Sequence, residues 1–88
     1  MPPLQPVIEN VAIMVADNNH TQARHFIALV FGLRKYAGIF SYLMSIQNLE
    51  GHIPSELVKY RQNVTNAMFQ EVETLFGTEV VEKIKAVL

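Results

Sequence analysis

The sequence predicts an all-α protein, a compact bundle of four to five short helices that oligomerisation completes. Apolar residues recur at helical spacing along most of the chain, and glycine, proline and asparagine divide them into segments of helix length. Half of the 88 residues are apolar and only 17% are charged. This is more apolar surface than one small core covers, so we expect a second copy or a partner to cover the rest.

The chain length allows a single domain. We expect residues 1–5 to form an extended N-terminal arm, because prolines at positions 2, 3 and 6 disfavour a helix before Pro6. Residues 6–88 then form one helical domain. Its first helix is expected over residues 6–16, although the apolar run from Val11 to Val15 also fits a strand. We favour a helix because the chain has no second strand-like run with which it could pair.

The second helix is expected to begin at residue 19 or 21 and to run to about residue 35 or 36. Its interior, Phe26 to Leu33, has no polar residue. A helix that is apolar all round is buried all round, so this helix is expected to be central or shared with another subunit. Gly38 is expected to break or bend it.

Three further helices are expected beyond Gly38. The third spans about residues 39–50 and ends at Gly51, which suits a left-handed C-terminal cap. The fourth is capped by Ser55 and ends at Phe76, with Gly77 as its stop. Its apolar stripe, at spacings of three and four residues, comprises Leu57, Tyr60, Val64, Met68, Val72 and Leu75. The last, residues 79–88, is capped by Thr78 and carries a favourable Glu79–Lys83 pair.

Charge and composition argue against several classes of protein. The net charge is −1, and the seven basic residues are spread over the chain, whereas nucleic-acid and anionic-membrane binding need clustered lysine and arginine. A membrane span is not expected, because Arg34 and Lys35 interrupt the most apolar window. The chain has no cysteine and its first residues lack a signal-peptide pattern, so we expect a cytoplasmic location.

No motif for catalysis, a cofactor or a metal is present. The three histidines, His20, His25 and His52, lack the four-residue spacing of helical metal pairs. No serine lies in a nucleophile elbow, and the four glycines are too dispersed to cradle a phosphate. We therefore expect no enzymatic activity, no cofactor and no metal site.

The strongest functional signal is the density of aromatic residues between positions 26 and 46. Phe40 and Tyr42 point about 200° apart on a helix, so one small bundle cannot bury both. Aromatic side chains near arginine and methionine are typical of protein interfaces. We predict an interface formed by Phe31, Arg34, Tyr36, Phe40, Tyr42 and Met44.

These observations predict a small helical protein–protein interaction module of the adaptor, chaperone, immunity or inhibitor type. Its expected partners are a second copy of itself, as a homodimer, and another protein. The alternative is a small DNA-binding transcriptional regulator that contacts phosphates through Arg24, Arg34 and Lys35. The helix after the expected turn at residues 33–38 has no arginine, lysine, asparagine or glutamine for reading bases before Gln47, so we favour the interaction module.

Overall fold

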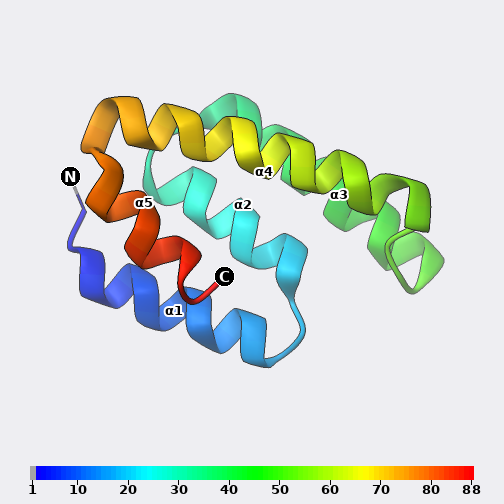
Figure 1. Ribbon diagram of the computed structural model, residues 1–88. Helices are drawn as coiled ribbons and strands as arrows, with labels where there is room; N and C mark the ends of the chain where they lie inside the picture. Colours follow the sequence, from blue (N-terminus) through cyan, green and yellow to red (C-terminus); the bar gives the residue numbers. More distant parts are fainter. Residues whose placement is uncertain (1) are drawn as a thin grey trace.

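The computed structural model describes residues 2–88, which form five helices and no strand, and it confirms the predicted all-α bundle (Figure 1). Met1, part of the expected arm, lies outside the described residues. The helices are α1 (Leu4–Ala16), α2 (His20–Val30), α3 (Arg34–Glu50), α4 (Ser55–Phe76) and α5 (Thr78–Lys85).

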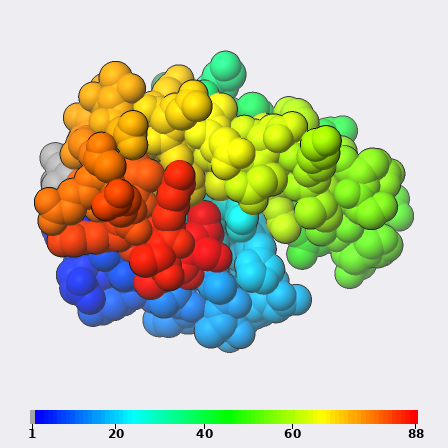
Figure 2. All heavy atoms as spheres, viewed as in Figure 1, coloured from blue at the N-terminus to red at the C-terminus, as the bar shows by residue number. Residues whose placement is uncertain are grey.

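Helix α2 lies at the centre of the bundle and packs against α1, α3 and α4. Helix α5 folds back at Gly77 and packs on both α4 and α1, which closes the bundle. The molecule measures 35 × 23 × 18 Å. Its long axis follows α4, and the C-terminal end of α3 and the N-terminal end of α4 project beyond the other helices (Figures 1 and 2).

Helix α1 begins two residues earlier than expected, at Leu4, so the extended arm does not reach residue 5. Pro6 is the third residue of the helix. The first N–H groups of any helix lack a partner within it, so a proline in the first turn removes no hydrogen bond. Residues 7–16 are helical, which resolves the helix-or-strand alternative in favour of the helix.

Helix α2 ends at Val30, and the expectation that it continues to residue 35 or 36 is wrong. The chain reverses at Gly32, which has φ of +70°. The Leu33 N–H donates to the Ala28 carbonyl at 2.9 Å, and the Gly32 N–H donates to the Leu29 carbonyl at 3.1 Å. This is a Schellman motif. Gly38, expected to break the helix, instead lies exposed inside α3 with nothing to disturb the helical path.

The same motif ends α1, with an asparagine in the glycine position. Asn18 has φ of +63°. The Asn19 N–H donates to the Met14 carbonyl at 2.8 Å, and the Asn18 N–H donates to the Val15 carbonyl at 3.0 Å. Asparagine tolerates the left-handed conformation better than other non-glycine residues, which explains its place here.

The expected helix stops are confirmed, but two expected caps are wrong. Gly51 ends α3 in the left-handed conformation, with φ of +81°, and Gly77 ends α4. Ser55 and Thr78 do not cap α4 and α5. They are the first helical residues, the cap positions belong to Pro54 and Gly77, and neither helix has a side-chain cap hydrogen bond.

All five helices contribute to the core. Its fully buried large side chains include Val11, Ile27, Phe40, Leu43, Met68, Val72 and Ile84. The expectation that α2 is buried on all sides is wrong, because Leu29 is 58% exposed. The stripe expected on α4 is displaced. Tyr60 and Leu75 are exposed, whereas Thr65, which was not expected on the buried face, is buried. Within residues 2–88, no helix combines the length and apolarity needed to cross a membrane.

Candidate functional site

The most unusual feature of the interior is a polar cluster between α2 and α4. Its members are Thr21 and Arg24 on α2 and Arg61 and Thr65 on α4, which we call the arginine–threonine cluster. Arg24 Nε donates to Thr65 Oγ1 at 2.9 Å, and Arg24 Nη1 donates to the His20 carbonyl at 2.8 Å. Arg61 Nη1 donates to Thr21 Oγ1 at 2.9 Å. Each helix therefore sends one arginine to a threonine of the other.

Local spacing places these side chains together. Thr21 and Arg24 are three residues apart, and Arg61 and Thr65 are four apart, so each pair lies on one helical face. Both threonine hydroxyls also donate. Thr65 Oγ1 bonds the Arg61 carbonyl at 2.7 Å, and Thr21 Oγ1 bonds Gln47 Oε1 at 3.2 Å. The second bond connects the cluster to α3, so three helices share it.

The cluster has no counter-charge within the part of the chain that the structure describes. The acceptors of both arginines are hydroxyl and carbonyl oxygens, and the one ion pair in residues 2–88 is Glu79–Lys83, at 3.0 Å. Burial, and next the charge of Arg61, lower the pKa of Arg24 to about 10, and burial lowers the pKa of Arg61. Both side chains stay charged at neutral pH. Buried charge without an opposite charge is costly, so an arrangement of this kind attracts anions.

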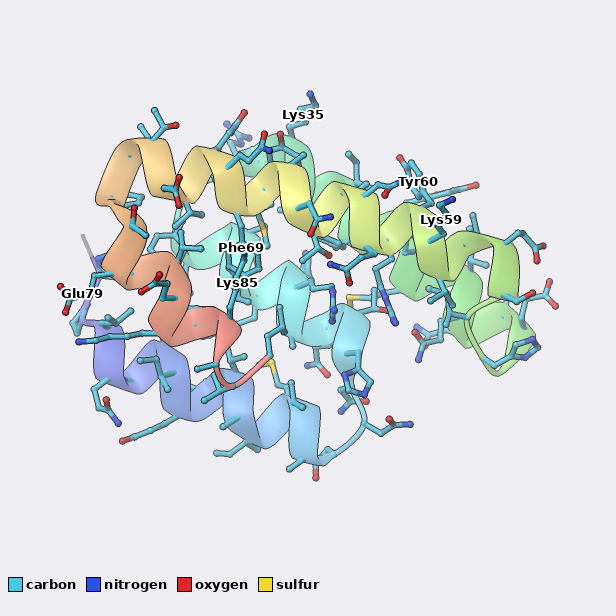
Figure 3. All side chains as sticks on the ribbon, viewed as in Figure 1. Lys35, Lys59, Tyr60, Phe69, Glu79 and Lys85 are labelled. Carbon is cyan, nitrogen blue, oxygen red and sulfur yellow. The ribbon has the colours of Figure 1, made fainter. Side chains whose placement is uncertain are left out.

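A cavity opens on each side of the cluster. The first, of about 330 Å³, we call the basic cavity; it is lined by Asn18, His20, Gln47, Gly51, His52, Ile53 and Arg61. The second, of about 360 Å³, is lined by Arg24, Gln62, Thr65, Asn66, Phe69, Lys85 and Leu88. In the second, Lys85 Nζ lies 5.4 Å from the centre of the Phe69 ring, where it makes a cation–π contact (Figure 3). Neither cavity is lined by a carboxylate side chain.

Three of the six predicted interface residues belong to the core of the chain itself. Phe31, Tyr36 and Phe40 are at most 7% exposed, so they offer almost no area to a partner. Phe31 instead packs against Phe76, with ring centres 5.1 Å apart.

Tyr36 is buried at the contact between α3 and α4. Its hydroxyl donates to Glu71 Oε1 at 3.3 Å. Burial and the neighbouring Glu71 carboxylate raise the pKa of Tyr36 above its usual value, so the phenol remains a neutral donor at physiological pH. This tyrosine therefore holds two helices together.

The other three predicted interface residues are accessible. Tyr42 is 63% exposed on the outer side of α3, Arg34 is exposed at the start of that helix, and Met44 is half-buried. Leu49, which was not among the predicted interface residues, is 87% exposed and lies seven residues after Tyr42. As predicted, Phe40 and Tyr42 are not both buried: Phe40 faces the core, and Tyr42 faces outward.

The residues considered for catalysis and metal binding do not come together. Residues 2–88 contain no group of three or more histidine and acidic side chains that could hold a metal ion. Ser45 donates back to the Tyr42 carbonyl at 2.7 Å, and Ser55 lies exposed at the start of α4. Arg24, one of three basic residues assigned to the nucleic-acid alternative, is 8% exposed and donates hydrogen bonds within the chain through Nε and Nη1.

Sequence reasoning missed Thr21, Arg61 and Thr65. A signal for Arg61 and Thr65 was present in the sequence of α4, where both lie on the same helical face as the buried residues Val64 and Met68. The prediction aligned the buried face on apolar residues alone and so displaced it toward Tyr60. A threonine and an arginine four residues apart on a buried face mark a pair that must find partners inside the protein.

No protein-family model, curated protein or solved structure matches the chain.

Proposed function

We propose that the protein is a non-enzymatic interaction module that pairs with a second copy of itself through the outer face of α3. The observation that carries this proposal is the distribution of charge and apolar surface on that helix. Its 17 residues carry Arg34 and Lys35 at the start, Glu50 at the end and no charge between them.

The outer face of α3 combines exposed apolar side chains with small ones. Tyr42 and Leu49 are 63% and 87% exposed. Gly38 and Ser45, on either side of Tyr42, are also exposed. A glycine inside a helix costs about 0.5–1 kcal/mol relative to alanine. Close approach of another helix, as small residues permit, would offset that cost.

The charges at the ends of α3 oppose its own dipole. A helix favours negative charge at its N-terminus and positive charge at its C-terminus, by about 0.3–1 kcal/mol each. Here the signs are reversed, so helix stability does not account for them. A second α3 packed antiparallel about a two-fold axis at Tyr42, the middle residue, brings Arg34 of each copy to the same height along the helix axis as Glu50 of the other. Lys35 then lies over Leu49, where its aliphatic stem covers apolar surface.

Sedimentation velocity tests this proposal across a range of micromolar concentrations. We expect a dimer for the natural chain and a monomer for Tyr42→Glu, because a carboxylate at the two-fold axis meets its own copy. Tyr60→Glu is the matched control, since Tyr60 is a partly exposed tyrosine on the projecting end of α4 (Figure 3). It is expected to leave the dimer intact.

A charge exchange tests the orientation. Arg34→Glu and Glu50→Arg each place like charges opposite one another and are expected to weaken association, whereas the double variant restores it. A natural chain that stays monomeric throughout the concentration range would overturn the proposal. Failure of the double variant to recover would overturn the antiparallel arrangement.

A further inference from the structure

The basic cavity brings together donors from three separate parts of the chain. Asn18 lies in the turn before α2, and His20 is the first residue of that helix. Gln47 near the end of α3 and Gly51 to Ile53 in the following turn form the second part, and Arg61 comes from α4. In Figure 2 the surface is concave between the start of α2 and the projecting end of α3 and α4, the segments that line this cavity.

Arg61 is held in place while most of its hydrogen-bonding capacity stays unused. Its guanidinium has five N–H groups. One of them, on Nη1, donates to Thr21 Oγ1, and no side-chain hydrogen bond within residues 2–88 uses the others. No buried side-chain nitrogen or oxygen in that range lacks a partner. The unused N–H groups therefore reach accessible space, and the fixed Nη1 aligns the planar fork.

Two imidazoles are positioned beside this guanidinium. His20 Nε2 is 3.0 Å from Asn18 Oδ1, and His52 Nδ1 is 3.2 Å from the Glu50 carbonyl. Each contact engages one ring nitrogen, as the donor, with an oxygen acceptor. The other ring nitrogen is an acceptor in the neutral ring and donates to an anion in the imidazolium form. His20 is also the first residue of α2, which has no side-chain cap and no acidic residue in its first turn. The positive end of the helix dipole is therefore not neutralised there.

The electrostatics of this cavity favour an anion. Its lining includes an arginine, two histidines and two amides but no carboxylate. Behind Arg61 lies the charge of Arg24, which is itself without an acidic partner in the described chain. A planar guanidinium matches the paired oxygens of a phosphate, and imidazolium and amide N–H groups supply further donors. A volume of about 330 Å³ exceeds that of a free phosphate and leaves room for a small organic group.

We propose that the basic cavity is a binding site for a small molecule that carries a phosphate group, with Arg61 as the principal anion donor and His20 and His52 as flanking donors. The site is independent of the α3 face, so it does not rest on the proposed dimer.

Isothermal titration calorimetry of the full chain, at constant ionic strength, tests this site with two probes. One is inorganic phosphate and the other is glycerol 3-phosphate. We expect saturable binding of at least one probe, with a dissociation constant of about 1 mM or lower. Tighter binding of the ester assigns the cavity to a phosphorylated small molecule, and equal affinity assigns it to the phosphate group alone.

Variants locate the binding. Arg61→Gln is expected to weaken it by about tenfold or more, because it removes the charge-assisted donors. His52→Ala, in an exposed turn, is expected to weaken it by roughly threefold without affecting the fold. Lys59→Gln is the matched control, because Lys59 is an exposed cation on the same helix (Figure 3), and it is expected to change the affinity less than about twofold.

The proposal is overturned if neither probe binds saturably. It is also overturned if both probes bind a natively folded Arg61→Gln variant and the His52→Ala variant as tightly as the natural chain. Circular dichroism of each variant identifies any loss of fold. If Arg61→Gln does not fold, the His52→Ala result alone decides.

Discussion

Single residues decide how this protein accommodates charge in its interior. Thr21 and Thr65 each accept a hydrogen bond from an arginine of the opposite helix and donate one to another oxygen. A hydroxyl is the smallest side-chain group that can do both. The threonines therefore give each of the two guanidinium groups a hydrogen-bond partner without introducing a carboxylate. The cluster keeps its net positive charge, which makes the neighbouring cavities attractive to anions.

At this scale, Thr65→Val is expected to destabilise the protein by about 1–3 kcal/mol. Valine keeps the shape of threonine but removes the acceptor of Arg24 Nε, so a buried charged donor loses its partner. Thr74→Val is the control, because Thr74 lies on the same helix and also bonds back to a carbonyl, that of Gln70 at 3.1 Å, but is exposed. It is expected to change the free energy of unfolding by less than about 0.5 kcal/mol. Urea denaturation measures both. Equal effects would show that Arg24 does not depend on Thr65.

At the scale of the elements, three glycines and Asn18 end helices in backbone conformations with positive φ. The φ angle distinguishes Gly32, which ends a helix, from Gly38, which does not. Gly32 adopts φ of +70° and ends α2, whereas Gly38 has no positive φ and lies inside α3. The break was expected at Gly38, the second of the two and six residues later than Gly32. Only the packing of α2 against α3 and α4 selects the first, because the turn at Gly32 lets Tyr36, Phe40 and Leu43 face the core.

The two glycines predict opposite effects of substitution by alanine. Gly38→Ala is expected to raise the free energy of unfolding by about 0.5–1 kcal/mol, because alanine favours the helix and a Cβ there meets nothing within 4 Å. Gly32→Ala is expected to lower it by about 1–2 kcal/mol, because alanine is strained at positive φ. Thermal or urea unfolding measures both, at concentrations below those at which sedimentation detects any dimer. A stabilising Gly32→Ala would contradict the left-handed turn.

The sequence predicted which segments are helical better than where the helices begin. Gly51 and Gly77 were recognised as stops because the left-handed conformation strongly favours glycine. Ser55 and Thr78 were expected to be caps because their side chains often are. In the structure the preceding residue takes that position, and the Ser55 hydroxyl donates to Glu56 Oε2 at 3.3 Å. Capping propensity alone does not fix the residue at which a helix begins, so the path of the preceding turn determines which residue takes the cap position.

At the scale of the whole molecule, α5 completes the bundle. It packs on α4, which precedes it, and on α1, the helix at the other end of the sequence. Its residues Val80, Val81 and Ile84 are buried. A chain of 88 residues has a narrow margin of stability. We therefore expect the fold to depend on the short last helix.

Accordingly, Ile84→Ala is expected to destabilise the protein by about 2–5 kcal/mol, since the side chain is fully buried and its removal leaves a cavity. Leu75→Ala is the control, because Leu75 is 60% exposed and its truncation is expected to cost less than about 1 kcal/mol. Chemical denaturation followed by circular dichroism compares the two variants. Equal costs would contradict the closing role of α5.

The sequence by itself determined that this protein is helical, because apolar periodicity and glycine positions are local signals carried by residues a few positions apart. It also determined that Phe40 and Tyr42 cannot share a core, since their angular separation is a property of one helix. Only the tertiary structure decided that Phe31, Tyr36 and Phe40 are core residues and that Arg24 and Arg61 share one polar cluster. Burial depends on which faces the neighbouring helices cover. The residues of the cluster lie about 40 positions apart in the chain, as Arg24 and Thr65 do, and no local pattern links them.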